Sequence, residues 1–141
     1  MELEVQAPAR SFRDLRVWQS AYELAIMVYK VCEGLPTHER YGLASQMSRA
    51  AVSVCSNIAE GFGRRTVKEK DQFYGVANGS LTELENQLLI AKGVGYVQNE
   101  DLLSLMNQAE KTHRMLVALQ KANKQHRPKL HSKIHNLTSI I

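Results

Sequence analysis

Apolar residues recur at helical spacing in four stretches of the chain, which predicts four α-helices. The first helix is expected over residues 14–33, where two apolar stripes run side by side. The stripes consist of Trp18, Tyr22, Ala25, Tyr29 and Cys32, and of Val17, Ala21, Leu24, Val28 and Val31. An apolar surface this wide is typical of a helix that is buried on more than one side.

The second helix is expected over residues 41–60, with an extra turn from about Thr37 as an alternative start, and the third over residues 67–94. Their predicted core positions are Leu43, Met47, Ala50, Ala51, Val54, Cys55 and Ile58, followed by Phe73, Ala77, Leu81, Leu84, Leu88 and Ala91. Gly61 and Gly63 are expected to break the second helix. Gly75 and Gly79 each cost about 1 kcal/mol relative to alanine inside a helix, so they predict close contacts with another helix.

The fourth helix is expected over residues 100–124, with Asn99 as its N-cap. Its predicted core positions are Leu102, Leu105, Met106, Ala109, Leu116 and Leu119. The connections between the helices are short, so neighbouring helices should pack antiparallel. No stretch alternates apolar and polar residues as a strand would. The prediction is an all-α domain over residues 1–125, an antiparallel up-and-down four-helix bundle.

Residues 126–141 form a basic C-terminal extension with its own apolar spacing. Leu130, Ile134, Leu137 and Ile141 recur at helical intervals after Pro128. We favour a short fifth helix that docks on its own bundle or on a neighbouring subunit. A frayed tail and a membrane contact are the alternatives.

Composition fits one globular domain of 141 residues, with 44% hydrophobic and only 6% aromatic residues. Cys32 and Cys55 follow no metal-ligand spacing, so buried thiols are expected. The acidic N-terminus has no apolar signal core, and no apolar run is long enough to span a bilayer. A cytoplasmic protein without a membrane partner is the expectation.

Charge is distributed unevenly along the chain. Residues 1–110 hold 11 Lys and Arg against all 14 Asp and Glu, whereas residues 111–141 hold 7 Lys and Arg and no acid. The basic end is a candidate for binding a polyanion such as RNA or DNA, although basic tails are often only solvated. The candidate contacts are Arg64, Arg65, Lys68, Lys121, Lys124, Arg127, Lys129 and Lys133.

A polar stripe follows the second helix, and a similar row follows the third. The predicted members of this network are Arg49, Ser53, Asn57, Glu60, Ser80 and Glu83. If the rows face each other, Arg49 pairs with Glu60 or Glu83, and Asn57 satisfies groups at a helix end. A buried network that fixes helix register or a subunit interface is the main interpretation. A ligand pocket and simple solvent exposure are the alternatives.

Catalytic and metal-binding signals are weak. Glu110 and His113 make one Glu-x-x-His unit, but di-iron bundles need two such units and further carboxylates. No nucleophile arrangement stands out. We therefore predict no cofactor, no metal and no catalytic residue, and a metal-dependent bundle enzyme is the least favoured function.

Four segments resemble the motifs of one protein family: residues 12–18 (FRDLRVW), 42–51 (GLASQMSRAA), 57–64 (NIAEGFGR) and 79–85 (GSLTELE). In this order and spacing they resemble the four-helix-bundle proteins encoded within intervening sequences of bacterial 23S ribosomal RNA genes. The resemblance covers residues 12–122.

The resemblance implies an up-and-down bundle that assembles into a ring, a homopentamer, with no established enzymatic activity. A more distant fold relative, the accessory protein of diversity-generating retroelements, is a basic pentameric bundle that binds nucleic acid and a reverse transcriptase. The predicted function is a non-enzymatic homo-oligomeric scaffold or binding module. The alternative is an accessory protein that contacts the RNA or DNA backbone, with or without a nucleic-acid-processing protein.

Overall fold

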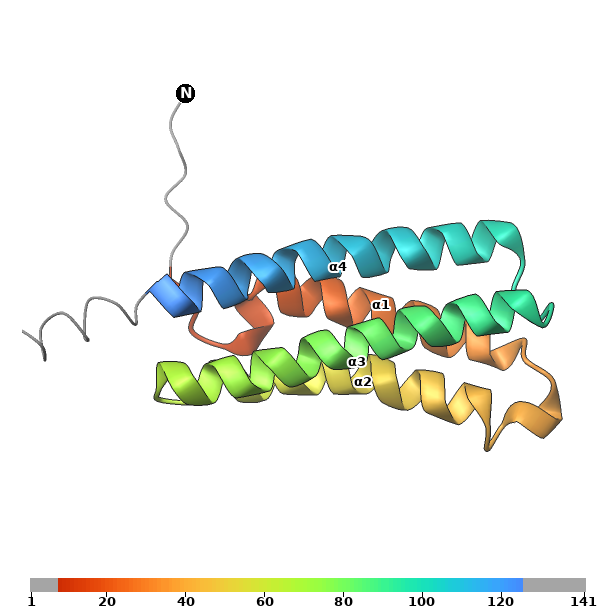
Figure 1. The fold of residues 1–141 in the computed structure, drawn as a ribbon, viewed down its shortest axis with the longest axis horizontal. Helices are drawn as coiled ribbons and strands as arrows, with labels where there is room; N and C mark the ends of the chain where they lie inside the picture. The colour runs from red at the N-terminus through yellow and green to blue at the C-terminus, as the bar shows by residue number, and fades with distance from the viewer. Residues whose placement is uncertain (1–7, 126–141) are drawn as a thin grey trace, which may run out of the picture.

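The computed structural model describes residues 8–125, which fold into four long helices (Figure 1). These are α1 (Arg16–Glu33), α2 (Leu43–Phe62), α3 (Val67–Gly93) and α4 (Asn99–Gln125). Two short 3-10 helices, η1 (Phe12–Asp14) and η2 (Thr37–Glu39), precede α1 and α2. No strand occurs between residues 8 and 125. The predicted C-terminal helix lies outside the described residues.

The helices form the predicted antiparallel bundle. α1 packs against α2 and α4, and α3 packs against the same two helices. Because successive helices run in opposite directions, the start of α1, the α2–α3 connection and the end of α4 meet at one end of the bundle (left in Figure 1). The η2 segment and the α3–α4 connection lie at the other end.

Two predicted helix starts are wrong by two residues. Ser11 and Asp14 form a capping box, but it caps η1, and the extended Leu15 (φ −72°, ψ 125°) separates η1 from α1. α2 begins at Leu43 because η2 and a turn precede it. α2 also continues through Gly61 to Phe62, so Gly61 does not break the helix.

The core is built from all four helices. Its largest fully buried apolar side chains are Leu24, Val28, Met47, Val54, Ile58, Leu81, Leu84, Leu88, Leu105 and Leu116. Only one α1 stripe follows the expectation: Val17, Leu24 and Val28 are buried, whereas Tyr22 and Tyr29 are half exposed. Within residues 8–125, α1 packs against both α2 and α4, but these helices do not fully cover the tyrosines of the aromatic stripe.

The close helix contact occurs at Gly61, not at Gly75 or Gly79. A Cβ at Gly61 would lie 2.5 Å from Tyr74 Cε1, which is closer than carbon atoms pack. A Cβ at Gly75 or Gly79 would meet no atom of the described residues within 4 Å. The prediction for Gly75 and Gly79 is therefore wrong for the single chain, because both glycines lie on the exposed side of α3.

Buried polar groups join α4 to its neighbours. The hydroxyls of Ser20 and Thr112 are 2.7 Å apart between α1 and α4, and Gln108 Nε2 donates to the Ser20 carbonyl at 3.0 Å. At the end of α4, Asn123 Nδ2 donates to the Val67 carbonyl at 3.1 Å. These directional bonds fix the position of α4 along the bundle.

Candidate functional site

The predicted polar rows of α2 and α3 meet at one point. The hydroxyls of Ser53 and Ser80 are 2.7 Å apart. Asn57 Nδ2 donates to the Ser53 carbonyl at 2.8 Å and to its hydroxyl at 3.0 Å, so Asn57 bonds within its own helix and not at a helix end. The three half-buried side chains link α2 to α3 at a defined register.

The charged members of the predicted network lie apart from this point. Glu60 accepts from Arg64 at 2.9 Å, and Glu83 accepts from Gln87 at 3.2 Å. Arg49 is exposed and forms no ion pair within residues 8–125. The expected pairing of Arg49 with Glu60 or Glu83 is therefore absent there, because both acids bind neighbours one turn away on their own helices.

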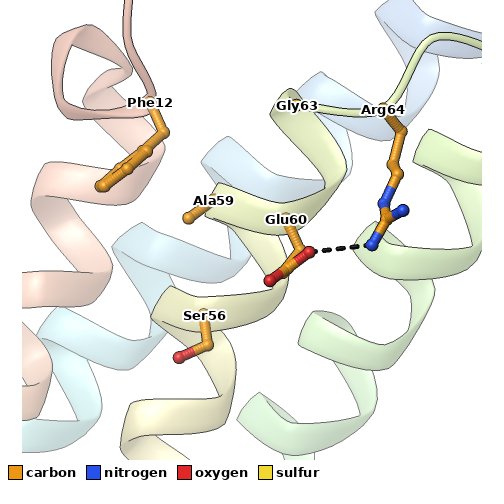
Figure 2. A pocket seen from close by; sticks show the side chains of 6 residues that line it. All are labelled: Phe12, Ser56, Ala59, Glu60, Gly63 and Arg64. Carbon is orange, nitrogen blue, oxygen red and sulfur yellow. Dashed lines mark hydrogen bonds and ion pairs between the residues drawn. The ribbon is translucent and has the colours of Figure 1, made fainter.

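Two open hollows follow the outer side of α2. One, of about 500 Å³, is lined by Phe12, Ser56, Ala59, Glu60, Gly63 and Arg64 (Figure 2). The other, of about 490 Å³, is lined by Tyr29, Ser45, Ser48, Arg49, Val52 and Ser53. In Figure 2, Phe12 faces α2 from the η1 side, and the Glu60–Arg64 pair lies on the opposite side of the hollow. Small side chains on α2 leave room for another element between these walls.

Aromatic rings form a ridge beside the small residues of α2. The rings of Phe12 and Trp18 meet edge to face at 5.1 Å, and those of Trp18 and Tyr22 stack at 5.2 Å. We call the combined surface the α1–α2 face. It comprises Phe12, Trp18, Tyr22 and Tyr29 with Ser45, Ser48, Val52, Ser56 and Ala59. The sequence signal for this face is the aromatic stripe of Trp18, Tyr22 and Tyr29 on α1.

Five of the predicted nucleic-acid contacts gather at one end of the bundle, which we call the basic end: Arg64, Arg65, Lys68, Lys121 and Lys124. The antiparallel topology brings them together, and the Asn123–Val67 bond ties α4 to the start of α3 there. Arg64 is engaged by Glu60 and lies 4.6 Å from the centre of the Phe73 ring. Arg127, Lys129 and Lys133 lie outside the described residues.

Glu110 and His113 do not form a metal centre with other residues of the described part. No group of three His, Cys, Asp or Glu side chains between residues 8 and 125 is placed to hold a metal ion. Glu110 forms an exposed ion pair with Arg114 at 3.3 Å. His113 lies between α3 and α4, where it lines a hollow of about 310 Å³ with Glu85 and three α4 residues.

Both cysteines are half-buried thiols. Cys32 donates weakly to the Ala44 carbonyl at 3.6 Å and accepts from Ser48 at 3.7 Å. Burial raises the pKa of Cys32, and it raises the pKa of Cys55 to about 11. Thiols with raised pKa values are poor nucleophiles at neutral pH.

No helix within residues 8–125 combines the length and apolar character that a membrane span requires.

Comparison with known proteins agrees with the fold. The family model described as "23S rRNA-intervening sequence protein" matches residues 13–118. A solved structure from Bacteroides thetaiotaomicron, described as a protein of unknown function from the S23 ribosomal protein family, superposes with a TM-score of 0.70 at 19% sequence identity. The superposition covers 74% of this chain and 95% of that one. None of the curated proteins matches the sequence. The extent of the family match and the four-helix architecture place this chain in the 23S rRNA-intervening sequence protein family.

Proposed function

We propose that this chain is a non-enzymatic scaffold that assembles with copies of itself into a closed ring, a pentamer, and binds a macromolecular partner. The observation that carries the proposal is the α1–α2 face. Tyr22 and Tyr29 are 49% and 50% exposed, and Tyr29 lines a hollow together with serine side chains of α2. Large aromatic side chains next to small residues are suited to receive another helix.

A second exposed apolar area supports a ring over a twofold dimer. Val76 and Ile90 are about half exposed on the outer side of α3, and Gly79 between them carries no side chain. This area and the α1–α2 face lie on different sides of the chain. Two different, complementary surfaces make a head-to-tail contact, which forms a ring when the rotation between copies closes and an open filament when it does not. Because Gly79 has no side chain, a tyrosine of a neighbouring copy can approach the α3 backbone closely there.

Light scattering on the purified chain tests the ring. The expected mass is near five protomers. Tyr22→Glu places a charge on the α1–α2 face and should reduce the assembly to monomers, since an unpaired charge in an interface is costly. Tyr41→Glu is the matched control, because Tyr41 is 89% exposed in the turn before α2 and is not part of this face. A monomeric parent chain, or equal masses for both variants, would contradict the proposal.

The basic end supports a second candidate function, which is contact with the backbone of RNA or DNA. Arg65 and Lys68 are exposed and form no ion pair within residues 8–125, and Lys121 and Lys124 share their end of the bundle. In a ring each copy would repeat these cations, so weak contacts would add through avidity. From Lys121 to Lys133 no Phe, Tyr or Trp interleaves the cations in the sequence, which argues against base stacking by the C-terminal cations.

Binding of a structured RNA at increasing salt tests this candidate. If the cations neutralise phosphates, the logarithm of the binding constant should fall linearly with the logarithm of the salt concentration, because binding releases counterions. The double substitution Arg65→Gln and Lys68→Gln should make that slope shallower by about two if both cations contact phosphate. Arg40→Gln with Lys92→Gln is the matched control, because both residues lie toward the opposite end of the bundle. Absence of RNA binding at low salt would exclude this function.

A further inference from the structure

The hollow between α3 and α4 lies apart from the α1–α2 face and from the basic end. It is lined by Glu85, Met106, Asn107, Glu110 and His113 and has a volume of about 310 Å³. Exposed leucines flank it: Leu89 is 53% exposed and lies one turn after Glu85, and Leu103 is 64% exposed and lies two turns before Glu110. The hollow therefore combines polar side chains with apolar surface, both in its lining and at its rim. We call this surface the α3–α4 groove.

Two buried polar atoms belong to the helix faces that form this groove. His113 Nδ1 and Asn78 Oδ1 are buried and have no hydrogen-bond partner within residues 8–125. Asn78 precedes Glu85 by two turns and lies on the same face of α3. Leaving such an atom unpaired costs about 1–3 kcal/mol, so the groove favours an occupant that brings hydrogen-bonding groups as well as apolar ones.

The groove also carries negative charge. Glu85 forms no ion pair within the described part of the chain. Glu110 has only an exposed partner, Arg114, at 3.3 Å. Lys111, the next residue after Glu110, lines a different hollow with α1 residues. Beyond Arg114, the next cations along α4 are Lys121 and Lys124. An occupant with positive charge is favoured at the two glutamates.

We propose that residues 126–141 of the same chain bind in the α3–α4 groove as an amphipathic helix. Leu130, Ile134, Leu137 and Ile141 have the i, i+4, i+7, i+11 spacing of helices that dock in apolar grooves. The segment contains three cations, Arg127, Lys129 and Lys133, and no acid, which complements Glu85 and Glu110. Its polar side chains include Asn136 and Thr138, which supply hydrogen bonds.

The tether is long enough for this arrangement. α4 rises about 18 Å between His113 and Gln125, at about 1.5 Å per residue. Residues 126–129 span up to about 13 Å when extended, and a helix over residues 130–141 adds about 18 Å. With the connection extended along α4, Leu130 falls near the partly exposed Val117, Ile134 near His113 and Leu137 near Glu110. A tethered segment of this length occupies the groove at high effective concentration.

A photo-cross-linking residue in place of Leu137 in the full chain tests the position of the segment. The expected products are attachments to α3 or α4 residues that line or flank the groove, within one chain. Mixing isotopically light and heavy chains separates attachments within a chain from those between chains. Attachment to the α1–α2 face, or attachment that occurs only between chains, would overturn the proposal.

Trypsin cleavage after Lys129 and Lys133 provides a second measurement with matched variants. Ile134→Asp with Leu137→Asp places charges on the apolar stripe, whereas Ser132→Asp with Ser139→Asp places the same charges on the opposite helix face. The first pair should speed cleavage about tenfold, because the released segment is open to the protease more of the time. The serine pair should leave the rate near that of the parent chain. Equal rates for the two variants would overturn the proposal.

Discussion

At the scale of single residues, the contact between Gly61 and Tyr74 is the tightest constraint on side-chain size in the bundle. A methyl group at position 61 would lie 2.5 Å from Tyr74 Cε1 and 3.1 Å from Phe73 Cβ. We expect Gly61→Ala to lower the free energy of unfolding by about 1–3 kcal/mol, because a packed ring must move. Urea denaturation followed by circular dichroism measures this change.

Gly75→Ala is the control for that substitution. Position 75 is also helical, but a Cβ there would meet no described atom within 4 Å. The exchange should therefore raise the free energy of unfolding by up to about 1 kcal/mol through helix propensity alone. If both variants lose stability equally, helix geometry and not the Tyr74 contact explains the glycine at position 61.

Thiol reactivity reports the burial of the two cysteines. A raised pKa means that the thiolate is scarce below that pKa, so Cys55, with a pKa of about 11, should react slowly with iodoacetamide at pH 8. Cys32 also has a raised pKa and should react more slowly than an unfolded thiol. Mass spectrometry of the native and the urea-unfolded chain measures both rates. Equal labelling rates in the two states would show that neither thiol is protected.

At the scale of helices, the pairing of α1 with α4 depends on a buried polar contact. Thr112→Val and Ser20→Ala each remove one hydroxyl of the 2.7 Å pair. We expect each single change to cost about 1 kcal/mol in the free energy of unfolding, and the double change to cost less than the sum, because the second removal relieves an unpaired group. Additive losses would mean that the two hydroxyls do not interact.

The helices themselves could be predicted from the spacing of apolar residues. The residues at which they begin and end could not, because these depend on contacts with other parts of the fold. Ser11 and Asp14 have capping-box spacing, yet the box closes a 3-10 turn because Leu15 is extended. Gly61 remains helical because it fits against Tyr74, and Lys70 Nζ donates to the carbonyls of Gly61 and Phe62 where α2 ends. Such ends are decided by tertiary packing, which overrides local propensity.

At the scale of the whole molecule, topology explains which parts of the candidate site could be foreseen. Lys68 and Lys121 are far apart in the sequence, but an up-and-down bundle places them at the same end, so the basic end follows from the predicted fold. The exposure of Tyr22 and Tyr29 could not be foreseen, because an apolar stripe has the same spacing whether its own bundle or another copy covers it. The α3–α4 groove depends on how two helices are spaced, which the sequence does not specify.

If copies of the chain cover the α1–α2 face, the stability of the bundle must depend on protein concentration. Unfolding then releases separate chains, so mass action favours the folded ring as concentration rises. For a pentamer, a tenfold increase in concentration should add about 1 kcal/mol per protomer and raise the Tm by about 4 °C. Thermal unfolding followed by circular dichroism at several concentrations measures the shift.

Tyr22→Glu should abolish the dependence of the Tm on protein concentration, and Tyr41→Glu should keep it. A parent chain whose Tm is the same at every concentration would instead be a monomer whose aromatic ridge is exposed to solvent.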